Sequence, residues 1–361
     1  MMYEYWLASI HRLSDEKKRR LREEYGDGKA VYYIEEMQLR FLDYLKPEDV
    51  DAILNKRKGG EMALKENWER LQEQKIRFIP YFTKDYPLRL KDILNPPYAL
   101  YVKGRLPEEE LPAVAIVGAR KCTPYGEEMA LEYGEYLALS GVQIISGMAR
   151  GIDGAGQRGA LNGGGATYGI LGCGVDICYP KDHIGLYMDM QVKGGVISEQ
   201  IPGQPPLPMY FPARNRIISG LADAVLIIEA KERSGSLITA DMALEQGREV
   251  YALPGPVTSS LSKGCHRLIR QGAGILISPE DLLSELGMGD KKFEQNSDKN
   301  QKVLESPENM VYSCLDLFPK GISQLIDETG LSVQEILERL ITLELKGYIR
   351  EVSKNYYIKV R

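Results

Sequence analysis

Two short polar segments of this chain carry side chains that are suited to binding an anion. Two arginines, an asparagine, three hydroxyls and a glycine belong to them: Arg214, Asn215, Arg216, Ser234, Gly235, Ser236 and Thr239. The apolar run at residues 224–228 separates the segments and predicts a buried parallel strand, with a helix opening in each segment. Guanidinium groups, hydroxyls and the free N–H groups of helix N-termini together favour phosphate. A hydroxyl could simply cap its helix, but capping does not explain the arginines and the asparagine.

Other predicted strands are also followed by glycines and basic residues that could contact an anion: Gly118, Arg120, Lys121, Gly147, Lys181 and Lys263. In a parallel α/β sheet these strand ends share one edge, where ligands bind, and glycine there lets backbone amides approach an anion. The alternative for the first of these loops is a tight turn with a surface arginine. Asp153 starts a predicted helix and is interpreted as a cap rather than as a catalytic carboxylate. The sequence has no G-x-G-x-x-G fingerprint and no G-x-x-x-x-G-K-[ST] loop, so neither a NAD site nor a P-loop ATPase is predicted.

A regular alternation of strands and helices predicts the sheet that positions these loops. Seven apolar runs form its strands: 113–117, 142–145, 166–171, 196–197, 224–228, 249–253 and 274–277. Parallel neighbours need crossover connections, so the pattern predicts an α/β fold, a doubly wound Rossmann-like parallel sheet. A proline-rich lead-in with short strands at 76–79 and 100–102 precedes it. We therefore predict one extended Rossmann-like domain over residues 76–288.

The rest of the chain predicts two smaller modules. Residues 1–75 have helical periodicity without strand-like alternation, which indicates a helical domain. Residues 289–306 are rich in Gly, Lys, Asp, Asn and Gln and are interpreted as a linker. Residues 307–361 predict three helices and a two-stranded wing, a winged-helix domain. Its third helix, opened by the capping box Ser332–Glu335, is not basic, so contact with protein is favoured over readout of duplex DNA.

Composition excludes several classes of protein. The chain has 361 residues, of which 43% are hydrophobic, and a formal net charge of −5. No apolar run approaches the ~20 residues of a membrane span and no secretory signal opens the chain, so we expect a cytoplasmic protein without a membrane partner. Five scattered cysteines fit a reducing compartment. Cys173 and Cys178 lack a partner pair and no Ser-His-Asp set can be assembled, so no metal site, cofactor or catalytic residue is predicted.

A series of motifs runs from residue 85 to residue 286: Asp85-Tyr-Pro87, Gly118-Ala-Arg120, Ser146 to Asp153, Tyr179-Pro180, Phe211 to Gly220, Ser234 to Ala240, Gly247 to Val250, Pro254-Gly255 and Leu268 to Ala273. In these motifs and their order the chain resembles the DprA/Smf family of DNA-processing proteins, and the flanking segments are similar more loosely. The sequence departs from the family at Gln157, where His is common, and at His183 and His266, where Asn is common. These exchanges preserve hydrogen bonding but argue against a catalytic role for the three residues.

The resemblance implies a sequence-independent single-stranded DNA binding protein that protects incoming strands and loads the RecA recombinase in natural transformation and recombination. It implies DNA contacts from Arg120, Lys121, Lys181, Arg214, Asn215, Arg216 and the loop 234–239. It also implies a SAM-like N-terminal domain and a homodimer whose interface includes His266, Leu268 and Ile269. A row of cations along repeating phosphates predicts little sequence preference and a steep loss of affinity with salt.

An enzyme is the competing interpretation. The same fold, with its glycine-rich strand ends, also resembles nucleotide phosphoribohydrolases related to lysine-decarboxylase-like proteins, in which a carboxylate assists glycosidic cleavage. Glu199 and Glu229 follow predicted strands and are the candidates for that role. The chain lacks that family's Pro-Gly-Gly-x-Gly-Thr pattern, and its basic residues lie in more loops than one nucleotide requires. A third interpretation is an adaptor whose active surface is the winged helix. The binding protein is preferred over both.

Overall fold

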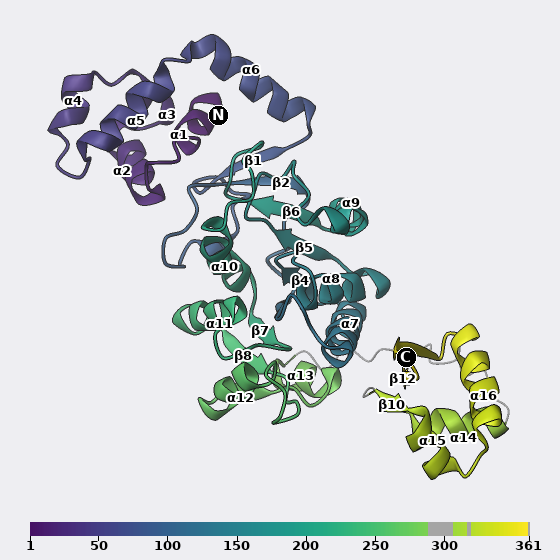
Figure 1. Ribbon diagram of the computed structural model, residues 1–361. Helices are drawn as coiled ribbons and strands as arrows, with labels where there is room; N and C mark the ends of the chain where they lie inside the picture. The colour runs from purple at the N-terminus through teal and green to yellow at the C-terminus, as the bar shows by residue number, and fades with distance from the viewer. Residues whose placement is uncertain (288–305, 316–318, 360–361) are drawn as a thin grey trace.

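The computed structural model describes residues 1–287, 306–315 and 319–359 (Figure 1). In chain order these residues form a group of helices, a large sheet with helices on both faces, and a small module of helices and strands. The predicted linker, 289–306, lies outside the described residues except for its last residue.

The central sheet is built from strands β1 (Arg77–Pro80), β2 (Ala99–Gly104), β3 (Ala113–Val117), β4 (Gln143–Ser146), β5 (Thr167–Ile170), β6 (Gly195–Ser198), β7 (Ala224–Ile227), β8 (Glu249–Ala252) and β9 (Gly274–Ile275). Their order is β1-β2-β6-β5-β4-β3-β7-β8-β9. Strands β3 to β9 are parallel and are the seven that the sequence predicts, so the predicted fold class is confirmed. The lead-in strands extend the same sheet, because β2 pairs antiparallel with β6, which the sequence pattern did not indicate.

Helices cover both faces of this sheet: α7 (Pro124–Leu139), α8 (Ile152–Asn162), α9 (Ile184–Lys193), α10 (Tyr210–Leu221), α11 (Gly235–Glu245), α12 (Lys263–Arg270) and α13 (Pro279–Glu285), with short 3-10 turns η1 (Leu88–Leu90) and η2 (Lys181–His183). The alternation of side chains along β3 explains the two layers. Val114 and Ile116 pack with α7 and α8 on one face. Ala113, Ala115 and Val117 pack with α10 and α11 on the other. The strand is therefore apolar along its whole length, as a strand buried on both faces must be.

Helices α7 and α8 lie unusually close because glycines face the partner helix at their contact. A Cβ atom at Gly134 of α7 would lie 2.1 Å from the Gly156 carbonyl oxygen, and one at Gly159 of α8 would lie 2.1 Å from the Leu131 carbonyl oxygen. Any larger side chain would push the helices apart. This packing fixes the first turn of α8, which follows β4 at the carboxyl edge of the sheet.

The N-terminal helices are α1 (Met2–Ala8), α2 (Asp15–Tyr25), α3 (Gly28–Tyr33), α4 (Glu36–Phe41), α5 (Pro47–Arg57) and α6 (Gly60–Glu73). Their buried carboxylate Glu4 accepts hydrogen bonds from Arg22 Nε at 3.1 Å, from the Gly28 N–H at 2.9 Å and from the Tyr98 hydroxyl, which lies just before β2. This group of helices is thus joined to the sheet by a buried polar contact. The segment is helical, but its division from the sheet at residue 75 stays a prediction.

The C-terminal module contains α14 (Ser306–Cys314), β10 (Lys320–Gly321), α15 (Ile322–Thr329), α16 (Val333–Leu345), β11 (Ile349–Ser353) and β12 (Tyr356–Lys359). The strands form a sheet in the order β10-β12-β11. The predicted capping box is present at α16, because the Ser332 N–H donates to Glu335 Oε2 at 2.9 Å and the Glu335 N–H donates to Ser332 Oγ at 3.3 Å. The predicted winged helix is therefore confirmed. Its first helix was predicted over residues 308–318, of which 316–318 lie outside the described residues.

Across residues 1–287, 306–315 and 319–359, we find no helix with the length and apolar character that crossing a membrane requires.

Candidate functional site

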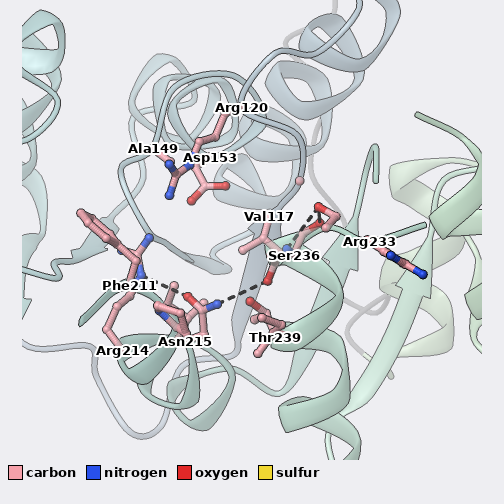
Figure 2. A pocket seen from close by; sticks show the side chains of 16 residues that line it. Val117, Arg120, Ala149, Asp153, Phe211, Arg214, Asn215, Arg233, Ser236 and Thr239 are labelled. Carbon is pink, nitrogen blue, oxygen red and sulfur yellow. Dashed lines mark hydrogen bonds between the residues drawn. The ribbon is translucent and has the colours of Figure 1, made fainter. Parts of the chain in front are cut away.

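The candidate site lies at the carboxyl edge of the sheet, between β3 and β7. From β3 the chain builds the sheet outward through β4, β5 and β6, and then returns to place β7 on the other side of β3. Parallel sheets bind ligands at such a reversal point. A cavity of about 360 Å³ lies there (Figure 2). Most of the predicted contact residues line it: Gly118, Arg120, Arg214, Asn215, Ser234, Gly235, Ser236 and Thr239.

Arg214, near the start of α10, is the buried cation of this cavity, with 5% of its surface exposed. Its Nη1 donates to the Gly147 carbonyl at 2.7 Å and to the Ile170 carbonyl, at the ends of β4 and β5. Burial lowers the pKa of the guanidinium to about 10, against the opposing influence of Asp153. Arg214 therefore stays charged at neutral pH, and it holds α10 against two strand ends as well as presenting charge to the cavity.

Asp153, in the first turn of α8, lines the same cavity. Its Oδ2 accepts a hydrogen bond from the Gly147 N–H at 3.1 Å. Burial raises the pKa of this carboxyl. Arg214 and the backbone amides of Gly118, Gly147 and Ala149 lower the pKa, but the effect of burial is larger. The carboxyl group thus binds backbone amides of the loops after β3 and β4. The sequence analysis interpreted Asp153 as a helix cap, and this is corrected: Gly151 is the N-cap of α8 and no side chain caps the helix, so the structural role of Asp153 is to join the two loops.

Gly147 has no room for a side chain. A Cβ atom at this position would lie 2.1 Å from Arg214 Nη2 and 2.4 Å from its Cζ. Its carbonyl group accepts a hydrogen bond from the same guanidinium. The sequence analysis assigned Gly147 to the ligand-binding loop. In the structure, Arg214 also packs directly against this glycine.

The N-terminus of α11 forms a wall of the cavity. Ser234 caps this helix, because its Oγ accepts from the Ser236 N–H at 3.4 Å, and the two Oγ atoms lie 2.8 Å apart. Asn215 Nδ2 donates to the Gly235 carbonyl at 3.4 Å and so joins α10 to α11. Thr239 lines the cavity one turn further along the helix. Hydroxyls and first-turn N–H groups facing one space make an arrangement suited to phosphate.

Two aromatic rings beside the cavity are functional candidates that the sequence analysis missed. The Phe211 ring lines the cavity, and the Arg120 Cζ atom lies 5.6 Å from its centroid. The ring of Tyr179, which is 43% exposed, lies 5.5 Å from that of Phe211, centroid to centroid. These residues, with Lys121 and Arg150, border an adjoining cavity of about 180 Å³. Basic residues interleaved with aromatic ones in the strand-end loops were the signal that could have revealed this surface, because rings stack on nucleobases.

Arg216 is not placed as the sequence analysis expected. Its Nη1 donates to Glu199 Oε1 at 3.1 Å and its Nε donates to the Asn95 carbonyl at 2.9 Å. Both side chains of this ion pair are largely buried, at 14% and 12% exposure. The prediction of a direct ligand contact is therefore corrected: Glu199, just past β6, satisfies the charge of Arg216, and the pair anchors α10. Lys181 and Lys263 are exposed, but they line neither cavity, and their contact with a ligand stays a prediction.

The residues predicted for a dimer interface lie on α12. Leu268 is 2% exposed and packs in the core beneath the sheet, so it is not free to contact a second subunit, and its assignment is corrected. The His266 ring nitrogen Nε2 lies 3.0 Å from the Gly255 carbonyl oxygen. His266 and Ile269 are half-buried and remain candidates. The helix turns its leucine inward because a helix lying on a sheet must bury one face.

The carboxylates proposed for catalysis are both engaged in structural contacts. Glu229 accepts from the Thr123 N–H at 2.8 Å and from the Thr123 hydroxyl at 2.6 Å, at the start of α7. Glu199 is held by Arg216. Neither residue lines the cavity, which removes the support for a glycosidic role. In the part of the chain that the structure describes, no group of three His, Cys, Asp or Glu residues could hold a metal ion.

Comparison with known proteins places these features in a family. Residues 77–287 match the family described as DNA recombination-mediator protein A, and residues 295–353 match the DprA winged helix domain. Protein Smf of Escherichia coli (strain K12) is 38% identical over 295 residues, which cover 79% of this chain and 78% of that protein. DNA processing protein DprA of Streptococcus pneumoniae (strain ATCC BAA-255 / R6) is 44% identical over 200 residues, which cover 55% of this chain and 71% of that protein.

Two solved structures are also similar. The X-ray structure of DNA processing protein A from Streptococcus pneumoniae matches with a TM-score of 0.69 and 34% identity, over 79% of this chain and 98% of that one. A structure of DNA processing protein A from Helicobacter pylori, which concerns that protein's single-stranded DNA binding mode, matches with a TM-score of 0.53 and 27% identity. That match covers 59% of this chain and 95% of that one.

Proposed function

The chain belongs to the DprA/Smf family of DNA-processing proteins, and on this basis we propose that it binds single-stranded DNA, without regard to sequence, at the cavity between β3 and β7. The observation that supports this best is the combination found at that cavity. The N-terminus of α11 offers hydroxyls and amides to a phosphate, and Arg120 and Phe211 lie at the same opening. Every nucleotide of a strand carries a phosphate, which the polar groups can bind, and a base, which can stack on the aromatic ring.

The aromatic rings favour an unpaired strand over a duplex. In a duplex the faces of the bases are stacked on one another, so they are not free to contact Phe211 or Tyr179. The Phe211 ring is half-buried, the Tyr179 ring is 43% exposed, and the two tilt by 40° to each other. A base face could therefore approach either ring. The polar groups of the cavity address the backbone, which is the same for every sequence.

Replacing Arg120 by alanine should weaken binding of single-stranded DNA by about tenfold at low salt. The side chain is exposed, so we expect the free energy of unfolding to change by less than about 0.5 kcal/mol. The slope of log Kd against log salt should fall by about one, because one phosphate contact is lost. Fluorescence anisotropy of labelled oligonucleotides of several sequences measures both quantities. The loss should be equal for all sequences.

Arg105→Ala is the matched control for this variant. Arg105 is also exposed, but it follows β2 at the opposite edge of the sheet, where its Nη2 donates to the Lys193 carbonyl at 3.0 Å. Its replacement should leave affinity and salt slope unchanged. Equal affinities for the Arg120 and Arg105 variants would contradict the proposed position of the strand.

The same proposal includes a role as a non-enzymatic loader of RecA onto the bound strand, acting as a homodimer in natural transformation or recombination. Family membership supports it, together with the two carboxylates being engaged in structural contacts. Assembly of RecA on single-stranded DNA should be faster when the protein is present, and the Arg214→Ala variant should not accelerate it. RecA assembly that is unchanged at saturating protein would rule out the loading role while leaving strand binding intact.

A further inference from the structure

The site cavity is much larger than a phosphate group needs. Its volume of about 360 Å³ falls within the range of about 300–1,000 Å³ that is typical of sites for small organic ligands. A phosphodiester running past the N-terminus of α11 would fill only the end near Ser234 and Ser236. The remaining space extends toward Arg120 and Phe211, on the far side of the cavity in Figure 2.

Two polar side chains at this cavity, Thr239 and Arg120, make no hydrogen bond within the described residues, although Arg120 lies against the Phe211 ring. Thr239 is 2% exposed and lines the cavity, and within the described residues its hydroxyl makes no hydrogen bond to protein. Figure 2 shows this side chain beside Asn215, below Ser236. Arg120 is an exposed cation whose guanidinium lies above the Asp153 carboxyl group in the same view. Because Thr239 lines the cavity, a ligand or water there could supply the hydrogen bond that its hydroxyl lacks.

The three elements around the cavity match the three parts of a nucleotide. The N-terminus of α11 suits a phosphate, the Thr239 hydroxyl lies where a sugar hydroxyl or ring nitrogen could reach it, and the Phe211 ring offers a stacking face. We propose that the cavity takes a complete nucleoside monophosphate with a terminal phosphate, supplied either as a free nucleotide or as the phosphorylated end of a strand. This inference rests on the proposed function, because it assigns a ligand class to the same site.

Isothermal titration calorimetry of the full chain with deoxyadenosine monophosphate tests the inference directly. We expect saturable binding, and binding of deoxyadenosine or of inorganic phosphate at least about tenfold weaker, because each makes only part of the contacts. Thr239→Val should weaken binding of the monophosphate about fivefold through loss of one hydrogen bond. Thr342→Val, on the exposed side of α16, is the matched control and should have no effect. No heat of binding up to about 10 mM nucleotide, or equal affinities for both variants, would overturn the inference.

Oligonucleotides with a hydroxyl or a phosphate at the 5′ or 3′ end distinguish the two sources of the ligand. If the strand end is the natural occupant, a phosphorylated end should tighten binding several-fold over the hydroxyl form. If the free nucleotide is the occupant, deoxyadenosine monophosphate should displace both forms alike. Oligonucleotides that bind while the monophosphate does not would overturn this inference and leave the proposed function standing. The monophosphate binding without any oligonucleotide would support the inference and overturn the proposed function.

Discussion

Arg214→Ala should lower the free energy of unfolding by about 3–5 kcal/mol and abolish binding of single-stranded DNA. The guanidinium is buried and donates to the carbonyl groups of Gly147 and Ile170, and it lies close enough to Asp153 to favour the charged form of each. Its removal leaves two carbonyls without their donor and a buried carboxyl without its cation. Urea unfolding followed by circular dichroism measures the first effect, and anisotropy measures the second.

Arg12→Ala is the matched control, and Arg214→Met with and without Asp153→Asn separates the charge of Arg214 from its bulk. Arg12→Ala removes an exposed arginine that pairs with Glu48 and should cost at most about 1 kcal/mol. Combining Arg214→Met with Asp153→Asn should be less destabilising than Arg214→Met alone, because no unpaired charge is left buried. A free energy of unfolding within about 0.5 kcal/mol of the parent protein for Arg214→Ala would contradict the assigned role.

Ser236→Asp should weaken binding of single-stranded DNA by at least about a hundredfold while leaving the fold intact or slightly more stable. The new carboxylate would stand in the first turn of α11, where a negative charge favours the helix by about 0.3–1 kcal/mol. The same charge would occupy the position that we assign to a phosphate and would repel it, by about 4 kcal/mol at 4 Å in a medium of intermediate dielectric constant. Affinity and stability should therefore change in opposite directions, which a variant that merely disrupts the fold cannot produce.

Ser278→Asp is the control for the change in net charge. Ser278 caps α13 through the Asp281 N–H, and aspartate serves equally well at such a position. This variant has the same net charge as Ser236→Asp, but the change lies away from the cavity, so DNA affinity should be unaffected. An equal loss of affinity in both variants would show that overall charge, rather than a local phosphate site, governs binding.

The sequence predicted the parallel part of the sheet well because its signals are local. Each strand from β3 to β9 is a short apolar run, and helical periodicity separates it from the next. The joining of β1 and β2 to the sheet was missed because it depends on pairing between distant residues, such as Tyr101 with Ser198. No local pattern specifies which strand accepts an antiparallel neighbour.

The site was predicted at the level of loops rather than of single side chains. Strand ends in a parallel sheet must converge, so the loops that carry Gly118, Arg214 and Ser234 could be placed together. Which side chains of a helix point into the cavity depends on the rotation of that helix about its axis. Arg214 and Arg216 are two residues apart on α10, about 200° around the helix, so only one of them can face the cavity. Arg216 pairs with Glu199, so Arg214 is the one that faces the cavity. No local pattern in the sequence indicates the contact between Arg216 and Glu199.

Competition between single-stranded and duplex DNA tests the central claim most directly. A labelled oligonucleotide of mixed sequence is titrated with the full chain at two salt concentrations, and the complex is then challenged with unlabelled single strand or unlabelled duplex. We predict tight binding that weakens steeply with salt, complete displacement by the single strand and little displacement by the duplex. No binding at low salt, or displacement by duplex as effective as that by single strand, would contradict the account.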